Sequence, residues 1–267
     1  MGAHAQRTFL ALLARDLRVL RRDLANFLVR VAVQPLLFVF VFGYVLPRMG
    51  AGFTGGGGRP TYTTVLVPGL VASTVLYQGL YTVAIPLVQE LSLSSEMEDR
   101  VLAPVPVWVL AVAKVVSGSA QALLGAAVVF PLVTLVHAAG QGPRIDVESV
   151  PLLAFVLVAT CALSACLGLL LGTLAEPRML NMLFSVVVLP LTMLGCTYYP
   201  WSGLDPIPWL KWAVLVNPLV YMSEGLRAAL TPEVGHLPTW AFTVALVIGT
   251  GAAGSLGVRT FARRVIG

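Results

Sequence analysis

Three polar residues at helical spacing, Tyr221, Glu224 and Arg227, are the side chains best placed to do chemistry in this sequence. Residues three apart on a helix are neighbours, so Glu224 and Arg227 can form an ion pair. A membrane enzyme needs polar groups of this kind close together. Two interpretations remain open at this point: a catalytic cluster, or a structural ion pair on a helix.

The histidines and cysteines give no sign of a metal site. The histidines are far apart in the sequence and lack ligand spacing. The cysteines are odd in number and lie in apolar segments, which argues against a disulfide framework. We therefore expect buried, apolar cysteines, no metal and no cofactor bound by this chain. The residues are His4, His137 and His236, and Cys161, Cys166 and Cys196.

The composition is that of an integral membrane protein. Of 267 residues, 58% are hydrophobic and 11% are charged, whereas soluble domains carry about 25% charged residues. Several apolar runs approach the roughly 20 residues that cross a bilayer. The net charge of +5 comes from basic residues concentrated at the two ends, so it indicates topology and not a nucleic-acid partner.

The predicted fold is all-α, with one polytopic transmembrane domain over residues 1–267. Ser164, Gly168 and Gly172 are spaced by four, which permits close helix packing. Gln78, in the middle of the second span, indicates contact with protein or a pore. Six spans are expected at about 27–46, 63–88, 109–137, 151–174, 181–196 and 239–256.

Before the first span, residues 7–26 have the pattern of an amphipathic helix. Leucines recur every three or four residues, and arginines occupy the other side. This pattern is typical of a helix that lies along a membrane surface, although a helix of a soluble bundle shares it. The basic residues of this predicted interfacial helix are Arg7, Arg15, Arg18 and Arg22.

Residues 91–106, between the second and third spans, form a short charged segment. Ser95 and Glu98 fit a capping box at a helix start, and Pro104 and Pro106 end the helix. Such a segment is either a docking surface or a solvated loop. Its polar residues are Ser95, Glu96, Glu98, Asp99 and Arg100.

Residues 197–230 are too rich in proline for one spanning helix and too apolar for an aqueous loop. Near their end, Asn217 is a helix N-cap and Pro218 takes the first helical position. The leucines and Met222 of that helix share one face, opposite Tyr221, Glu224 and Arg227.

The distribution of basic residues favours both termini in the cytoplasm. Of the 17 basic residues, five fall on the outer side in this orientation: Arg48, Arg59, Arg144, Lys211 and Arg227. The other twelve lie inside or at inner span ends. Residues 91–106 are then cytoplasmic, and the helix after Asn217 is on the outer side.

An energy source is not visible in the sequence. No span carries an acidic residue at its centre and the two halves show no repeat, which disfavours an ion-driven carrier. For an ion-driven carrier, the best candidates for the ionisable group that it needs are residues near span ends: Arg30, Lys114 and His137. The glycine run 55–58 lacks the spacing of a phosphate loop. We therefore expect a transporter of this kind to be powered by another polypeptide. Membrane enzyme and assembly factor remain as further alternatives.

The sequence resembles the permease subunits of ABC type 2 exporters, which move drugs, antibiotics, nodulation factors and polysaccharides. The likeness covers the N-terminal helix, the six-span layout, the stretch from Arg100 to Trp108 and the segment NPLVYMSEGLRAAL. In that segment the family pattern falls on Asn217, Pro218, Tyr221, Glu224, Leu226 and Arg227. The Gly-Thr pair often found before the Pro-Val stretch is replaced by other residues in this chain.

The resemblance implies a mechanism and partners. Residues 91–106 would be the coupling segment that docks on an ATPase, and residues 197–230 would be two re-entrant half-helices forming an outer gate. Two permeases, identical or paralogous, would join two ABC ATP-binding subunits that hold ATP and Mg²⁺, in a bacterial inner membrane. The polar face of Tyr221, Glu224 and Arg227 would meet the pathway mouth or the second permease. The cargo would be an amphipathic drug, antibiotic or lipid, or alternatively a polysaccharide or glycolipid.

Overall fold

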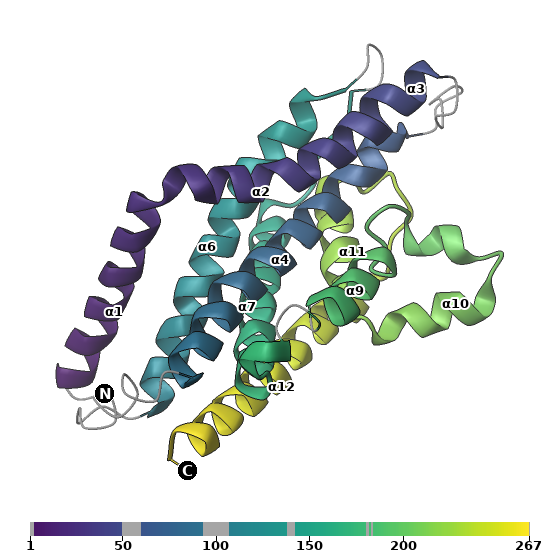
Figure 1. Cartoon of the computed structure of the whole chain (residues 1–267). Helices are drawn as coiled ribbons and strands as arrows, with labels where there is room; N and C mark the ends of the chain where they lie inside the picture. The colour runs from purple at the N-terminus through teal and green to yellow at the C-terminus, as the bar shows by residue number, and fades with distance from the viewer. Residues whose placement is uncertain are drawn as a thin grey trace.

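The computed structural model describes residues 3–49, 60–92, 107–137, 142–179, 182 and 184–266, and this part of the chain is all-helical (Figure 1). Five of its helical segments are long and apolar enough to cross a bilayer. We conclude that the chain is a multi-pass membrane protein. The five candidate spans are Leu24–Val45, Tyr62–Leu91, Trp108–Leu135, Val150–Leu174 and Thr239–Arg264.

The N-terminal region is two helices that meet at an angle (Figure 1). Helix α1 (Ala3–Arg22) ends one residue before α2 (Leu24–Val39) begins. The π-helical turn η1 (Phe40–Val45) and the short α3 (Leu46–Arg48) extend α2 to the end of the bundle opposite both termini. We call this end of the bundle the far end, and we call the end where both chain termini lie the termini end.

Helix α4 (Tyr62–Ser92) is the centre of the bundle. It packs against α6 (Val107–Leu135), α7 (Val150–Leu174) and α11 (Pro218–Leu230). Except for Val65 and Leu91, its leucines and valines are almost completely buried, because helices cover it on several sides. Helix α12 (Thr239–Ile266) packs on α7 at the edge of the bundle and is longer than the expected span.

Small residues let α4 and α7 approach closely, as the spacing of Ser164, Gly168 and Gly172 predicts. A Cβ atom on Gly168 would lie 2.8 Å from the carbonyl oxygen of Gly79, and one on Gly172 would lie 2.9 Å from the Cα of Ala84. Because backbone atoms occupy that space, larger side chains would separate the two helices.

The fifth expected span, 181–196, does not form one long helix in the part that the structure describes. Its described helical residues are the π-helical η3 (Phe184–Val188) and α9 (Leu189–Met193). A turn follows, in which Cys196 has a left-handed φ of 52°. These stretches are shorter than the roughly 20 residues of a spanning helix, so the six-span count is not confirmed.

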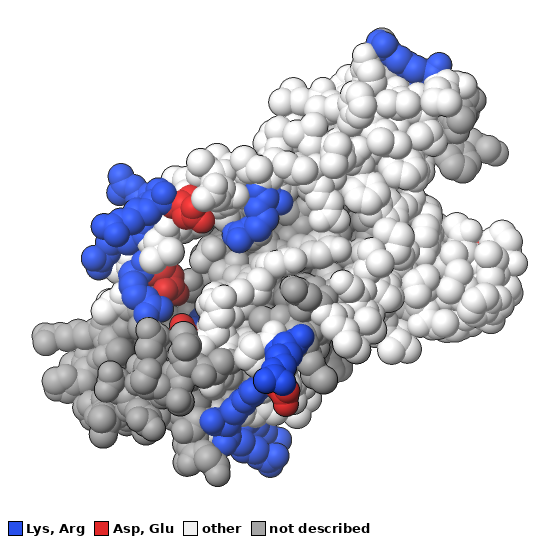
Figure 2. All heavy atoms as spheres, in the orientation of Figure 1, with Lys and Arg blue, Asp and Glu red and all other residues white. Residues whose placement is uncertain are grey.

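Basic side chains gather at the termini end on the face shown in Figure 2, and a smaller basic patch marks the end of α3. On α1, Arg15, Arg18 and Arg22 are exposed, and so are Leu10 and Leu17. An exposed apolar side with arginines nearby fits the predicted interfacial helix, which stays a prediction. The side chain of Arg7 lies outside the described residues, and so does the expected coupling segment with Ser95, Glu96, Glu98, Asp99 and Arg100.

Candidate functional site

Helix α11 begins as the sequence predicts. The side-chain oxygen of Asn217 accepts a hydrogen bond from the backbone N–H of Leu219 at 2.9 Å, and Pro218 is the first helical residue. The amide nitrogen of Asn217 also donates to the carbonyl oxygen of Leu191 at 2.7 Å. The cap therefore starts α11 and joins it to α9.

Glu224 and Arg227 form the predicted ion pair, and both side chains are 0% exposed. One carboxylate oxygen of Glu224 also accepts the backbone N–H of Trp201 at 3.0 Å. The other accepts the backbone N–H of Leu237 at 3.0 Å. The carboxylate thus connects α11 to the segments before and after it.

The guanidinium of Arg227 reaches two further segments. It donates to the carbonyl oxygen of Cys196 at 2.9 Å and, over a longer distance of 3.4 Å, to that of Val65 in α4. Its Nε has no hydrogen-bond partner among the described residues. Buried charges need such bonds to offset their lost hydration, so the pair is a structural junction.

The burial of this pair corrects the expectation that the polar face of α11 meets a pathway mouth or a second permease. From Leu219 to Leu230, every residue except Tyr221 is buried within the chain. Helices α4, α7 and α12 pack around α11, while the segments at Trp201 and Leu237 close over the carboxylate. Helical periodicity predicts a polar face but not the loops that cover it.

Tyr221 is bonded away from the pair. Its hydroxyl donates to the carbonyl oxygen of Leu215 at 2.8 Å. Burial raises the pKa of Tyr221, so the phenol keeps the proton that it donates. The three polar residues therefore have separate structural bonds and do not form a shared catalytic cluster.

The stretch before α11 differs from it in burial. It contains η4 (Trp201–Leu204), α10 (Pro208–Ala213) and η5 (Val214–Val216). Trp209 and Trp212 on α10 are exposed, as tryptophans at a membrane interface are. Lys211 pairs with Asp205 and lies 4.0 Å from the ring centroid of Trp201. Residues 197–230 thus contain a short exposed helix, α10, and a buried helix, α11. Their arrangement as re-entrant half-helices stays a prediction.

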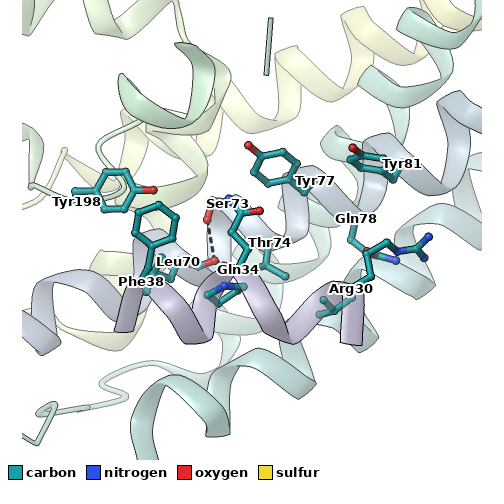
Figure 3. Close-up of a pocket in the computed structure, with 12 residues that line it drawn as sticks. Arg30, Gln34, Phe38, Leu70, Ser73, Thr74, Tyr77, Gln78, Tyr81 and Tyr198 are labelled. Carbon is teal, nitrogen blue, oxygen red and sulfur yellow. Dashed lines mark hydrogen bonds between the residues drawn. The ribbon is translucent and has the colours of Figure 1, made fainter. Parts of the chain in front are cut away.

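A cavity of about 200 Å³ lies between α2 and α4 (Figure 3). We call it the α2–α4 cavity. Its apolar wall includes Leu70 and Phe38, and Tyr198 stands at one end. Its other labelled side chains are polar or aromatic with a hydroxyl: Arg30 and Gln34 from α2, and Ser73, Thr74, Tyr77, Gln78 and Tyr81 from α4. A chamber with both kinds of wall suits a compound that is itself amphipathic.

A second cavity of about 580 Å³, which we call the termini-end cavity, lies where α1, α2, α4 and α6 meet. Two ion pairs line it: Arg15 with Asp16 at 3.2 Å, and Lys114 with Glu90 at 2.8 Å. Arg30 and Tyr81 line both cavities. The two cavities are therefore neighbours that share these side chains.

The sequence prediction included only part of the α2–α4 cavity. Gln78 indicates contact with protein or a pore, and the structure buries it at the cavity wall. A stronger signal is that two helices each carry polar residues four positions apart. These are Arg30 and Gln34 on α2, and Thr74 and Gln78 on α4. Side chains four apart share a helix face, so two such stripes can line one space.

The expectation of buried cysteines is confirmed in the described part of the chain, whereas the expected absence of a metal stays a prediction. Cys161, Cys166 and Cys196 are free and buried. Histidine, cysteine and acidic residues form no group suited to a metal ion within the described ranges. The three cysteines thus act as small packing residues in the bundle.

Comparison with known proteins assigns the chain to a family. No curated protein sequence matches it. A sequence profile of the ABC-2 type transporter family, however, matches residues 7–231. That range includes most of α1, the lining of both cavities and all of α11. Because the profile covers most of the sequence, the chain belongs to the membrane component of the ABC-2 type transporter family.

Proposed function

We propose that this chain is the permease subunit of an ATP-driven exporter. The observation that carries the proposal is the family match over residues 7–231. Two permeases, identical or paralogous, work with two ABC ATP-binding subunits, which bind ATP and Mg²⁺. The complex lies in the bacterial inner membrane with both termini in the cytoplasm. The permease binds and moves the cargo, and the ATPase supplies the energy.

The α2–α4 cavity is the proposed part of the path within one permease. Its polar groups, such as Gln34 and Ser73, face an apolar wall that contains Phe38 and Leu70. An amphipathic drug, antibiotic or lipid has matching polar and apolar parts. A polysaccharide or glycolipid is the second cargo class, because the tyrosines and glutamines also offer hydrogen bonds to hydroxyl groups.

Helix α11 is the proposed outer gate, in a form that its burial supports. The Glu224–Arg227 pair holds α11 against α4 and against the segments at Cys196, Trp201 and Leu237. A helix fixed at that many points moves as one unit with its neighbours. The gate therefore opens by displacement of this packed unit and not by exposure of its charges.

Residues 91–106 are the proposed coupling segment, with Ser95, Glu96, Glu98, Asp99 and Arg100 as its docking residues. The end of α4 and the start of α6, which flank it, lie at the termini end (Figure 1). Glu90 near the end of α4 and Lys114 near the start of α6 are joined at 2.8 Å. A force on the segment thus reaches two central helices together.

The test is ATP hydrolysis by the purified complex of this chain with its ATP-binding subunit. We expect hydrolysis to depend on the permease, and Glu98→Arg to uncouple transport from it, because the docking face loses a negative charge and gains a positive one. Glu148→Arg is the matched control, since Glu148 is exposed in the loop before α7. A rate of ATP hydrolysis that is the same with and without the permease would refute the docking proposal. Equal effects of Glu98→Arg and Glu148→Arg on coupling would also refute it.

A further inference from the structure

Arg30 occupies a distinctive position between the two cavities. It lies within the first candidate span and lines both the α2–α4 cavity and the termini-end cavity. In Figure 3 Arg30 lies at the same end of the α2–α4 cavity as Gln78 and Tyr81, opposite Tyr198. A solute that passes from one cavity to the other meets this side chain.

Arg30 has no ion-pair partner within the part of the chain that the structure describes. The carboxylate of Asp23 also lines the termini-end cavity, where it accepts a hydrogen bond from the side chain of Asn26. Arg30 is exposed and makes no hydrogen bond or ion pair with the described residues. The other cations of the termini-end cavity, Arg15 and Lys114, each have an acidic partner. An unpaired guanidinium in a membrane-spanning helix is unfavourable unless an anion or water reaches it.

The chemistry around Arg30 indicates which group fits there. A guanidinium binds the oxygens of carboxylates and phosphates with two parallel hydrogen bonds. Its neighbours Gln34 and Gln78 add neutral amide donors, and Phe38 and Leu70 lie farther along the same cavity as an apolar wall. The arrangement is a cationic end followed by an apolar chamber.

We propose that Arg30 is the specificity-determining residue of the cargo site and that the cargo is an amphiphile with a carboxylate or phosphate group. The proposal rests on the proposed export function. The anionic group binds at Arg30, where the cavities meet, and the apolar part lies in the α2–α4 cavity. Uncharged amphiphiles lack the partner for the guanidinium and bind more weakly.

A binding experiment on the full chain, without ATP or ATPase, tests this assignment. The probes are dodecanoic acid carrying a nitrobenzoxadiazole fluorophore and its methyl ester, added to the protein in phosphatidylcholine nanodiscs. We expect the acid to bind at least about tenfold more tightly than the ester, because a hydrogen-bonded charge pair is lost in the ester. Arg30→Gln should abolish this preference, and Arg30→Lys should keep part of it.

The matched control is Arg48→Gln, which changes an arginine at the far end of the same helical segment, outside both cavities. It should leave the preference for the acid unchanged. Equal binding of acid and ester, binding of neither, or a preference that survives Arg30→Gln would each overturn the proposal. None of these results depends on ATP-driven transport, which the hydrolysis experiment above tests separately.

The anion at Arg30 has two possible sources, the cargo and a phospholipid of the bilayer. Transport by the complex with its ATPase in vesicles distinguishes them. Faster movement of the acid than of the ester, with the difference lost in Arg30→Gln, supports a cargo site. Arg30-dependent binding of the acid without faster transport would show that a resident lipid is the ligand, and would overturn the assignment to cargo.

Discussion

The α11 ion pair and Arg30 show two different uses of charge in one membrane protein. Glu224 and Arg227 are fully buried, paired with each other and bonded to backbone groups of four other segments. Arg30 is exposed to two cavities and has no partner among the described residues. In the first arrangement the charges are paired and hydrogen-bonded inside the fold. In the second, a charge remains available to a ligand.

This difference separates a structural role from a binding role more clearly than residue type does. A buried pair that loses one member leaves an uncompensated charge, so the fold suffers. An exposed, unpaired side chain contributes little to stability, so its loss changes what the cavity binds. The variants below test both halves of the comparison.

The largest effect is expected for Arg227→Ala, which leaves the Glu224 carboxylate buried without its cation. We expect a loss of about 3–5 kcal/mol in the free energy of unfolding, measured by denaturation of the purified protein in detergent. Arg144→Ala is the control, because Arg144 is exposed in the loop before α7. Its effect should stay within about 0.5 kcal/mol. Equally mild effects in both variants would contradict the structural role of the pair.

The next effect concerns the backbone that receives the Arg227 hydrogen bond. A Cβ atom on Gly69 of α4 would lie 2.6 Å from the Cα of Thr197, next to Cys196. Gly69→Ala should therefore displace this turn and lower the unfolding free energy by roughly 1–3 kcal/mol. Gly251→Ala has open space around its new methyl group and should be neutral or slightly stabilising. A tolerated Gly69→Ala would show that the contact is loose.

An intermediate effect is expected at the partly buried pair of Glu90 and Lys114. Lys114→Met should lower the unfolding free energy by about 1 kcal/mol and weaken the stimulation of ATP hydrolysis by the permease. The exchange Glu90→Lys with Lys114→Glu should restore much of both, because contacting residues are energetically coupled. If the exchange behaves as the sum of its two single variants, the pair does not link α4 to α6.

The smallest effect on stability is expected for Arg30→Gln. Because the side chain is exposed and lacks a partner among the described residues, the unfolding free energy should change by less than about 0.5 kcal/mol. The same denaturation assay used for Arg227→Ala measures it. A loss comparable to that of Arg227→Ala would mean that Arg30 is structural, and the comparison between the two sites would fail.

Local sequence rules predicted the start of α11 and its ion pair, since capping and three-residue spacing involve only neighbouring residues. They also predicted the close packing of α4 and α7 from small residues such as Gly168. They did not predict the burial of Glu224, because its partners lie in the short helical turn at Trp201 and the loop at Leu237, which are too short to show a periodic pattern. The end of the described helix in the fifth segment has a similar cause: the turn at Cys196 depends on contacts with α4 and α11.

The central claim is that ATP hydrolysis by a partner drives export through this chain. The direct measurement is transport of an amphipathic probe by the purified complex in sealed vesicles, with ATP added on the ATPase side. We predict transport that requires both ATP and the permease and that stops when the ATPase is inactivated. Transport without ATP, driven by an imposed proton or ion gradient, would contradict the claim and identify a secondary carrier.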